Sequence, residues 1–177
     1  MPLVIFERPG EEAAVRAVVA DAFGDERTPA LVDALRRSSA WRNLSFVAEE
    51  AGAIVGHVSF TRGWLDAPSK LIEVLILSPL SVAREYQGRG IGSALVLESL
   101  ANLRSRPEPL VFLEGSPRYY GRLGFRPGGE AGFVAPSSRI PAAAFQFVTL
   151  PAYEPGMTGA LVYPDAFWEN DSVGLRP

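Results

Sequence analysis

The chain has 177 residues and a formal net charge of −3, with 47% hydrophobic and 21% charged residues. Such a length and composition are typical of one globular domain, which we expect to span residues 1–177. The acidic balance argues against a nucleic-acid surface and mildly favours a cationic substrate. Cysteine is absent and His57 is the single histidine. A disulfide framework and thiol catalysis are therefore excluded, and no metal site is expected.

The N-terminal stretch and the lengths of the apolar runs indicate where the protein is located, and the choice of basic residues indicates its source. The N-terminal stretch lacks the basic start and long apolar region of a signal peptide, and no apolar run is long enough to span a membrane. We therefore expect a cytoplasmic protein without a membrane partner. Lys70 is the one lysine among 17 basic residues. With abundant Ala, Gly and Pro, this usage points to a GC-rich bacterial genome.

The first sixty residues predict one strand, two helices and then two further strands. Apolar residues recur with the spacing of one helical face over residues 15–23, and Gly24 is well placed to end that helix. A second helix is expected near residues 28–37, with Thr28 as N-cap and Pro29 as first helical residue. The predicted strands are 3–6, 44–49 and 54–61, of which the last two form an antiparallel hairpin.

The remainder of the chain continues this alternation of apolar runs and helical patterns. Residues 62–69 are interpreted as a connection, because they contain Gly63 and Pro68. Residues 71–83 predict a long central strand, with a bulge or local break in pairing at Pro79. The other predicted elements are helices at 91–104, 117–123 and 165–169, and strands at 109–114, 144–150 and 159–163. Ser116 is the expected N-cap of the helix at 117–123, with Pro117 as its first residue. This order predicts the α/β class, with a central mixed β-sheet flanked by helices.

A glycine-rich turn, QGRGIG at residues 87–92, stands between the central strand and the helix at 91–104. Glycine lets the backbone approach a ligand closely and adopt positive φ. A strand, a glycine turn and a helix N-terminus together form an anion site, to which the helix dipole adds about half a positive charge. The turn is therefore predicted to hold a phosphate or pyrophosphate. The alternative is a plain strand-to-helix turn.

Two common nucleotide motifs do not fit this turn. A Walker loop requires Gly-Lys-Ser/Thr, whereas Gly92 is followed by Ser93 and Ala94. A Rossmann fingerprint requires glycine three residues after Gly90, where Ser93 stands. The stretch does match Gln/Arg-x-x-Gly-x-Gly/Ala, as Gln87-x-x-Gly90-x-Gly92. This pattern resembles the acetyl-CoA pyrophosphate loop of the GNAT superfamily of N-acetyltransferases.

A second stretch strengthens this resemblance. Residues 119–125, YYGRLGF, look like the aromatic-Tyr-x-x-Leu-Gly-Phe signature of GNAT enzymes, in the order that the family requires. The resemblance covers at least residues 1–126, with an acetyl-CoA core at about 70–126. The YPDAF stretch at 163–167 resembles an uncharacterised bacterial single-domain branch. One departure is visible, because many members carry asparagine where this chain has Ser116-Pro117, which leaves that contact with the CoA arm in doubt.

The resemblance implies a set of residues that contact acetyl-CoA. Main-chain N–H groups at 88–93 would hold the pyrophosphate, and the end of the central strand, 80–84, would pair with the pantetheine arm. Arg84 and Arg89 either reach phosphates or are solvated surface arginines. The residues assigned to this cosubstrate are Leu80, Ser81, Val82, Ala83, Arg84, Gln87, Gly88, Arg89, Gly90, Ile91, Gly92, Ser93 and Ser116.

The resemblance also implies catalytic roles. Tyr120 matches the proton donor of the family and Tyr119 a core aromatic, although both can instead be packing residues. A tyrosine pKa near 10 lets Tyr120 stay protonated and donate to a leaving thiolate. Glu73 is the candidate general base, with solvation at the edge of the sheet as its alternative. His57 is a weaker candidate, for which a hydrogen-bonded structural histidine is the better interpretation.

The function that follows is transfer of an acetyl group from acetyl-CoA to a primary amine of a small molecule or peptide. A catalytically silent acyl-CoA-binding sensor or scaffold is the alternative, and transfer of a longer acyl group also stays open. Tyr120 separates the first two, since a silent protein has no reason to keep a proton donor. A homodimer is one assembly to test.

Overall fold

The computed structural model describes all of residues 1–177. Two compact units make up the chain: residues 1–61 with 77–102, and residues 62–76 with 103–177. Strands β3 (Ala53–Asp66) and β4 (Leu71–Val82) contribute to both. The strands pair in the order β1-β2-β3-β4-β5-β8-β6, with β9 on β3 and β7 on β9. Parallel and antiparallel pairs both occur, which confirms the predicted mixed α/β sheet with flanking helices.

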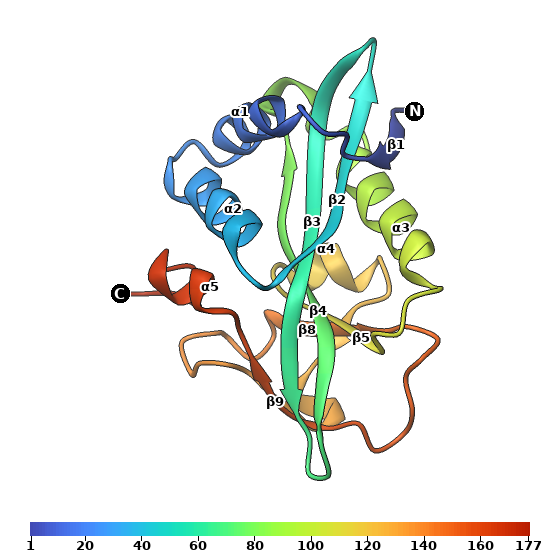
Figure 1. Cartoon of the computed structure of the whole chain (residues 1–177), viewed down its shortest axis with the longest axis vertical. Helices are drawn as coiled ribbons and strands as arrows, with labels where there is room; N and C mark the ends of the chain where they lie inside the picture. Colours follow the sequence, from blue (N-terminus) through green and yellow to red (C-terminus); the bar gives the residue numbers. More distant parts are fainter. The chain divides into compact units, whose positions relative to one another are not determined.

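The first unit is built around an antiparallel meander. It contains β1 (Leu3–Phe6), β2 (Trp41–Glu50) and the first part of β3, with Ser45 opposite Ser59 and Val47 opposite His57. Helices α1 (Glu12–Phe23) and α2 (Arg27–Arg37) lie side by side and bury valines against Val47. Figure 1 shows α3 (Ile91–Leu103) on the other side of β2 and β3.

Gly56 explains how α3 approaches the sheet so closely. It lies opposite Ala48, on the face away from Val47, because successive residues of a strand alternate between faces. A Cβ built on Gly56 would lie 2.8 Å from Leu95 Cδ1 and 3.3 Å from Ile91 Cγ2, both on α3. The missing side chain therefore fixes the start of α3 against β3.

The second unit is also a mixed sheet. The first part of β4 pairs in parallel with β5 (Leu110–Glu114), which pairs antiparallel with β8 (Phe145–Thr149). Phenylalanine rings form its core, with Phe112 stacked on Phe145 at 5.7 Å between ring centroids. The shorter elements are α4 (Pro117–Gly121), β6 (Arg126–Pro127), β7 (Phe133–Val134), β9 (Gly159–Val162) and α5 (Asp165–Glu169). None of the helices combines the length and apolar character that a membrane crossing needs.

Two local predictions need correction. Residues 62–66 are not a connection but the end of β3, because β9 supplies a partner, with Trp64 opposite Val162. Thr28 does not cap α2, which starts at Arg27. The Thr28 amide instead donates to the Asp25 side chain at 2.9 Å. The helix at 15–23, by contrast, ends as predicted, with Gly24 in the left-handed conformation at φ 67°. The peptide bond before Pro79 is cis.

Candidate active site

The glycine turn at residues 87–93 is open at its centre. Gly88 and Gly90 have φ of 74° and 82°, a region that other residues rarely adopt. No heavy atom lies within 4 Å of the position that a Cβ would occupy at either glycine. The backbone is thus exposed on the side from which a ligand would approach. These two observations fit a cradle for a phosphate-bearing substrate.

The start of α3 adds hydrogen-bond donors to this turn. The Ala94 amide donates to the Gly90 carbonyl at 3.0 Å. The amides of residues 91–93 come before that bond, at the end of the helix where N–H groups have no intrahelical acceptor. They lie at the positive end of the helix dipole, which favours an anion. This helix has 13 residues, so its dipole is fully developed.

Three hydrogen bonds tie the turn to the rest of the first unit. The Ala83 amide donates to the Val55 carbonyl at 2.9 Å, which links the end of β4 to β3. The Gln87 side-chain amide donates to the Val82 carbonyl at 2.9 Å. The Arg84 amide donates to the Asp21 carboxylate of α1 at 2.7 Å. The first residue of the sequence pattern, Gln87, therefore has a structural role in closing the turn.

The two arginines near the turn point elsewhere. The Arg84 guanidinium lies against Gly24, where a Cβ would overlap it. Arg89 lies over the Tyr86 ring, 5.0 Å from its centroid, and donates to the Glu85 carbonyl at 2.8 Å. In this arrangement the predicted anion site would consist of main-chain groups. Contact between either arginine and a phosphate stays a prediction.

Tyr120 belongs to the second unit, in the short helix α4. Ser116 caps this helix by accepting from the Tyr119 amide at 3.3 Å, with Pro117 as first helical residue, as the sequence predicted. The Tyr120 ring packs edge-on against Phe125 and Tyr119, at centroid distances of 5.7 and 4.9 Å. Its other neighbour is Gly115, where a Cβ would overlap the ring. These contacts hold the half-buried phenol in one place.

Burial sets the protonation state of Tyr120. Loss of hydration raises the pKa of its phenol above the usual value, and the neighbouring Tyr119 raises it further. The phenol therefore keeps its proton throughout the physiological range. A group in this state can donate a proton but cannot act as a base. This agrees with the role that the sequence motif implies for Tyr120.

Glu73 and Tyr120 both belong to the second unit, but they lie near opposite ends of β5. It lines a pocket of about 550 Å³ together with Arg106, Glu108 and Pro109, at the start of β5. Leu75 pairs in parallel with Val111, so Glu73 stands near the beginning of β5. Tyr120 follows the other end of that strand. The structure therefore does not bring the predicted general base and the predicted general acid together.

His57 lies in the interior of the first unit. Its side chain is fully buried, and its Nε2 lies 2.8 Å from the Ser45 hydroxyl oxygen. Burial lowers the pKa of the imidazole to about 3, and the positive charge of Arg36 adds to this effect. The ring is therefore neutral at pH 7. The structure confirms that His57 is a hydrogen-bonded, buried histidine.

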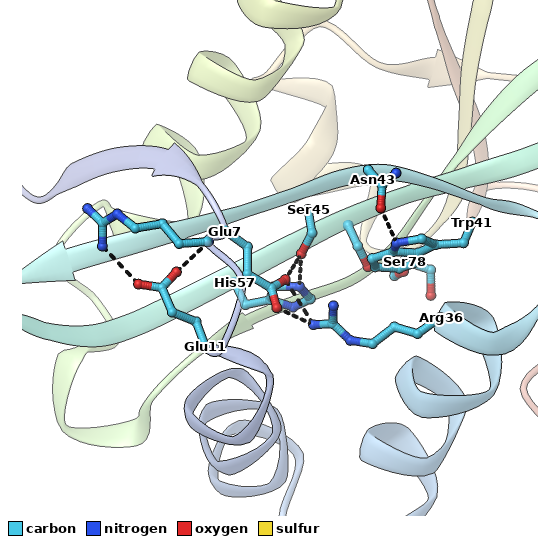
Figure 2. Close-up of polar contacts among 10 residues, drawn as sticks. Glu7, Glu11, Arg36, Trp41, Asn43, Ser45, His57 and Ser78 are labelled. Carbon is cyan, nitrogen blue, oxygen red and sulfur yellow. Dashed lines mark hydrogen bonds and ion pairs between the residues drawn. The ribbon is translucent and has the colours of Figure 1, made fainter.

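No sequence motif points to the residues around His57. Glu7, Arg36 and Ser45 come from the end of β1, α2 and β2, and they are far apart in the chain (Figure 2). Their proximity follows from pairing between distant strands. One indirect signal was available, since Ser45 is the polar residue in the otherwise apolar run at residues 44–48. No cluster of three or more His, Cys, Asp or Glu side chains is arranged for a metal ion.

Comparison with known proteins identifies the family of this chain. The family model described as acetyltransferase (GNAT) domain matches residues 7–128. The chain belongs to this family, and it is an enzyme of the acyltransferase class. It is 38% identical over 128 residues to the uncharacterized N-acetyltransferase YjhQ of Escherichia coli K12, a match that covers 69% of this chain and 68% of that protein.

Two solved structures resemble the whole chain. The GNAT family N-acetyltransferase YhbS from Escherichia coli, in complex with CoA, has a TM-score of 0.83 at 25% identity, covering 94% of this chain and 91% of its own. A GNAT family acetyltransferase from Brucella melitensis, in complex with acetyl-CoA, has a TM-score of 0.73 at 32% identity. That match covers 94% of this chain and 98% of the relative.

Proposed function

We propose that this protein transfers the acetyl group of acetyl-CoA directly to a primary amine of a small molecule or peptide. The observation that carries the proposal is the open glycine turn at the N-terminus of α3, with Gly88 and Gly90 at positive φ. Similar chains bind CoA and acetyl-CoA. The net charge of −3 favours a cationic acceptor.

In this proposal the first unit binds the cosubstrate. Amides of residues 88–93 hold the pyrophosphate, and the backbone at residues 80–84 pairs with the pantetheine arm as an added strand. Ser116, which the structure uses as a helix cap, contributes its hydroxyl in this proposal. Binding through main-chain groups explains why the turn needs glycine rather than a charged side chain.

Tyr120 is the general acid in this proposal. The amine nitrogen attacks the thioester carbonyl carbon, the carbon–sulfur bond breaks, and the sulfur takes a proton from the phenol. A thiol pKa near 8.5 makes the thiolate a moderate leaving group, and protonation makes its departure easier. The raised pKa of Tyr120 ensures that the proton is present at neutral pH. The amine must lose its own proton to another group.

The direct test is turnover of acetyl-CoA with a panel of amines, followed by mass spectrometry of the acceptor. We expect release of CoA that depends on one class of amine and that rises with amine concentration. Thermal shift with acetyl-CoA runs in parallel. A shift with acetyl-CoA but no turnover with any amine would instead support the silent acyl-CoA-binding protein. An absence of both would overturn the assignment of the glycine turn.

A further inference from the structure

A pocket of about 500 Å³ lies within the first unit, and no residue of the glycine turn lines it. It is formed where the chain leaves β1 and enters α1, and where α2 ends and β2 begins. Pockets for small molecules use a few placed polar groups to orient the ligand. The state of each polar group in this pocket therefore indicates which ligand it suits. Its polar and aromatic lining includes Glu7, Arg8, Glu12, Arg36, Trp41 and Asn43.

Arg36 is held in place by two groups and still has unused donors. Its Nη2 donates to both oxygens of the Glu7 carboxylate, at 2.7 and 2.8 Å. Its guanidinium carbon lies 4.8 Å from the centroid of the Trp41 ring. Nη1 and Nε make no hydrogen bond to the protein, and neither is buried away from solvent. The guanidinium therefore offers N–H groups of fixed direction, in the planar arrangement that suits a carboxylate.

Asn43 adds a further donor at an irregular point of β2. Its φ is 55°, in the left-handed region that asparagine adopts more readily than most residues. Trp41 is opposite Thr61 but Leu44 is opposite Phe60, so the strand bulges here, and a bulge redirects side chains. The Trp41 indole N–H donates to Asn43 Oδ1 at 3.0 Å (Figure 2). Because the amide oxygen is used in this way, the Asn43 Nδ2 hydrogens are left without a partner in the protein.

All charged residues that line the pocket are paired within the protein except one. Arg36 pairs with Glu7, and Arg8 pairs with two carboxylates that do not line the pocket. Glu12, in the first turn of α1, is exposed and has no hydrogen-bond or ion-pair partner. A free carboxylate favours a cation and repels a simple anion. The pocket thus combines unused donors for a carboxylate with a free acceptor for an ammonium group.

We propose that this pocket binds a small zwitterion, a molecule that carries both a carboxylate and an ammonium group. The carboxylate accepts hydrogen bonds from Arg36 and Asn43, and the ammonium donates to Glu12. A simple amine would leave the donors unused, and a simple carboxylate would be repelled by Glu12. The site goes beyond the proposed function, because binding here does not involve acetyl-CoA. Two sources share this chemistry, an amine acceptor that also carries a carboxylate and a separate effector, and acetylation of the ligand distinguishes them.

Binding is measured by NMR titration of the whole protein without acetyl-CoA. The probes are three zwitterions of increasing length: alanine, 4-aminobutyrate and alanyl-alanine. Each is compared with its carboxamide and with its N-acetyl form, which remove one charge at a time. We expect at least one zwitterion to shift the signals of the Trp41 indole N–H and the Asn43 side-chain amide. Both blocked forms should bind about tenfold more weakly, because each loses a charge-assisted hydrogen bond. Equal affinity for the zwitterion and its blocked forms would overturn the proposal.

Asn43→Asp is the variant that tests the carboxylate end. It keeps an oxygen for the Trp41 indole and a residue type that tolerates positive φ, but it replaces the donor by a negative charge. The dissociation constant of the zwitterion should rise by about tenfold or more. Asn102→Asp is the matched control, since Asn102 is exposed and its amide bonds within its own helix, α3; its affinity should equal that of the wild type. Arg36 is left intact, because its loss would strand the Glu7 carboxylate, which is 5% exposed.

Glu12→Gln tests the ammonium end. Glu12 has no partner in the protein to lose, so the fold should be unaffected. The variant should bind the zwitterion more weakly, whereas its affinity for the N-acetyl form should not fall, because that form has no ammonium group. The preference of the protein for the zwitterion over the N-acetyl form should therefore shrink toward one. A preference that stays at its wild-type value would overturn the role of Glu12 and with it the choice of a zwitterion.

Mass spectrometry of the bound zwitterion after incubation with acetyl-CoA identifies its source. An acetylated ligand is the acceptor, and Asn43→Asp should then raise its KM with little change in kcat. A ligand that binds and stays unmodified is an effector. The titration remains valid if no amine is turned over, so failure of the proposed function and failure of this site are distinguishable. Absence of binding by all three zwitterions, or wild-type affinity in Asn43→Asp, would overturn the site alone.

Discussion

Two regions of the molecule differ in what their residues provide. The glycine turn at residues 87–93 provides exposed backbone, whereas helix α4 provides one particular side chain, that of Tyr120. The turn is exposed at residues 87–90, and its glycines leave the backbone accessible because no side chain covers it. In α4, a single phenol is held between two aromatic rings and Gly115. In the proposed function, acetyl-CoA binding depends on the absence of side chains in the turn, and catalysis depends on the hydroxyl oxygen of Tyr120.

This difference determines which substitutions are informative. In the turn, we expect an added side chain to be disruptive and loss of a nearby arginine to matter little, because the proposed donors are main-chain amides. In α4, removal of one oxygen from Tyr120 abolishes the proposed chemistry while the packing stays intact. Four substitutions test this contrast, beginning with the one of largest expected effect.

Replacement of Tyr120 by phenylalanine should have the largest effect. It removes the hydroxyl and keeps the ring contacts with Phe125 and Gly115. Loss of a general acid typically lowers the rate by about 10²–10⁴-fold, so kcat should fall in that range. KM for acetyl-CoA should stay near its wild-type value. Steady-state kinetics with an accepted amine measures both constants.

Tyr119→Phe is the matched control for this change. Tyr119 is in the same helix and is also half-buried, and its ring contacts that of Tyr120. The same oxygen is removed one residue away, so kcat should change far less. An unchanged kcat in Tyr120→Phe would make water the proton source. A greater loss in Tyr119→Phe would transfer the role to that residue.

Glutamate at position 90 should have the next largest effect. The positive φ of Gly90 is unfavourable for any other residue by about 1–2 kcal/mol, and a carboxylate would repel the pyrophosphate. The dissociation constant for CoA should therefore rise by about tenfold or more. Calorimetry with the folded Gly90→Glu protein measures this change directly.

Gly52 provides the control for the backbone effect. It lies in the turn between β2 and β3, with φ of 80° and no heavy atom within 4 Å of the position that its Cβ would occupy. Gly52→Glu thus introduces the same strain and charge outside the predicted site. Its CoA affinity should equal that of the wild type. Undiminished binding by Gly90→Glu would contradict the assignment of the turn.

Whether a feature of these regions could be predicted from the sequence depends on how far apart in the chain the interacting residues are. The end of α1 at Gly24 and the cap of α4 at Ser116 were predicted because each depends on a few adjacent residues. The glycine turn was also readable, since positive φ strongly favours one residue type. In these places the local preference and the final structure agree.

Interactions between distant residues were not predictable in the same way. The end of β3 looked like a connection because its partner, β9, comes almost a hundred residues later. The contact of Ser45 with Glu7 and His57 depends on the register of three strands, which no single stretch encodes. The separation of Glu73 from Tyr120 likewise follows from the parallel pairing of β4 with β5.

The Gly115 position tests whether packing holds the Tyr120 ring in place. A Cβ at residue 115 would lie 2.8 Å from Tyr120 Cδ2 and would overlap the neighbouring ring carbon. Gly115→Ala should destabilise the protein by about 1–3 kcal/mol through overpacking. It should also lower kcat, although less than Tyr120→Phe, because the phenol is displaced rather than lost. Urea unfolding and kinetics on one preparation measure the two effects, and wild-type kcat with reduced stability would show that the ring position is not critical.

Loss of the Arg89 side chain should have the smallest effect of the four. Its guanidinium lies over Tyr86 and donates to the Glu85 carbonyl, and it lies 3.9 Å from the Glu50 carboxylate. Exposed ion pairs of this kind contribute about 0–1 kcal/mol, so Arg89→Ala should weaken CoA binding by no more than about fivefold. Main-chain amides remain in place in this variant, whereas Gly90→Glu disturbs them one residue away. Calorimetry on the two variants under one salt condition compares side-chain and backbone contributions directly. If Arg89→Ala lost more affinity than Gly90→Glu, the anion site would depend on a charged side chain, and the contrast between the two regions would fail.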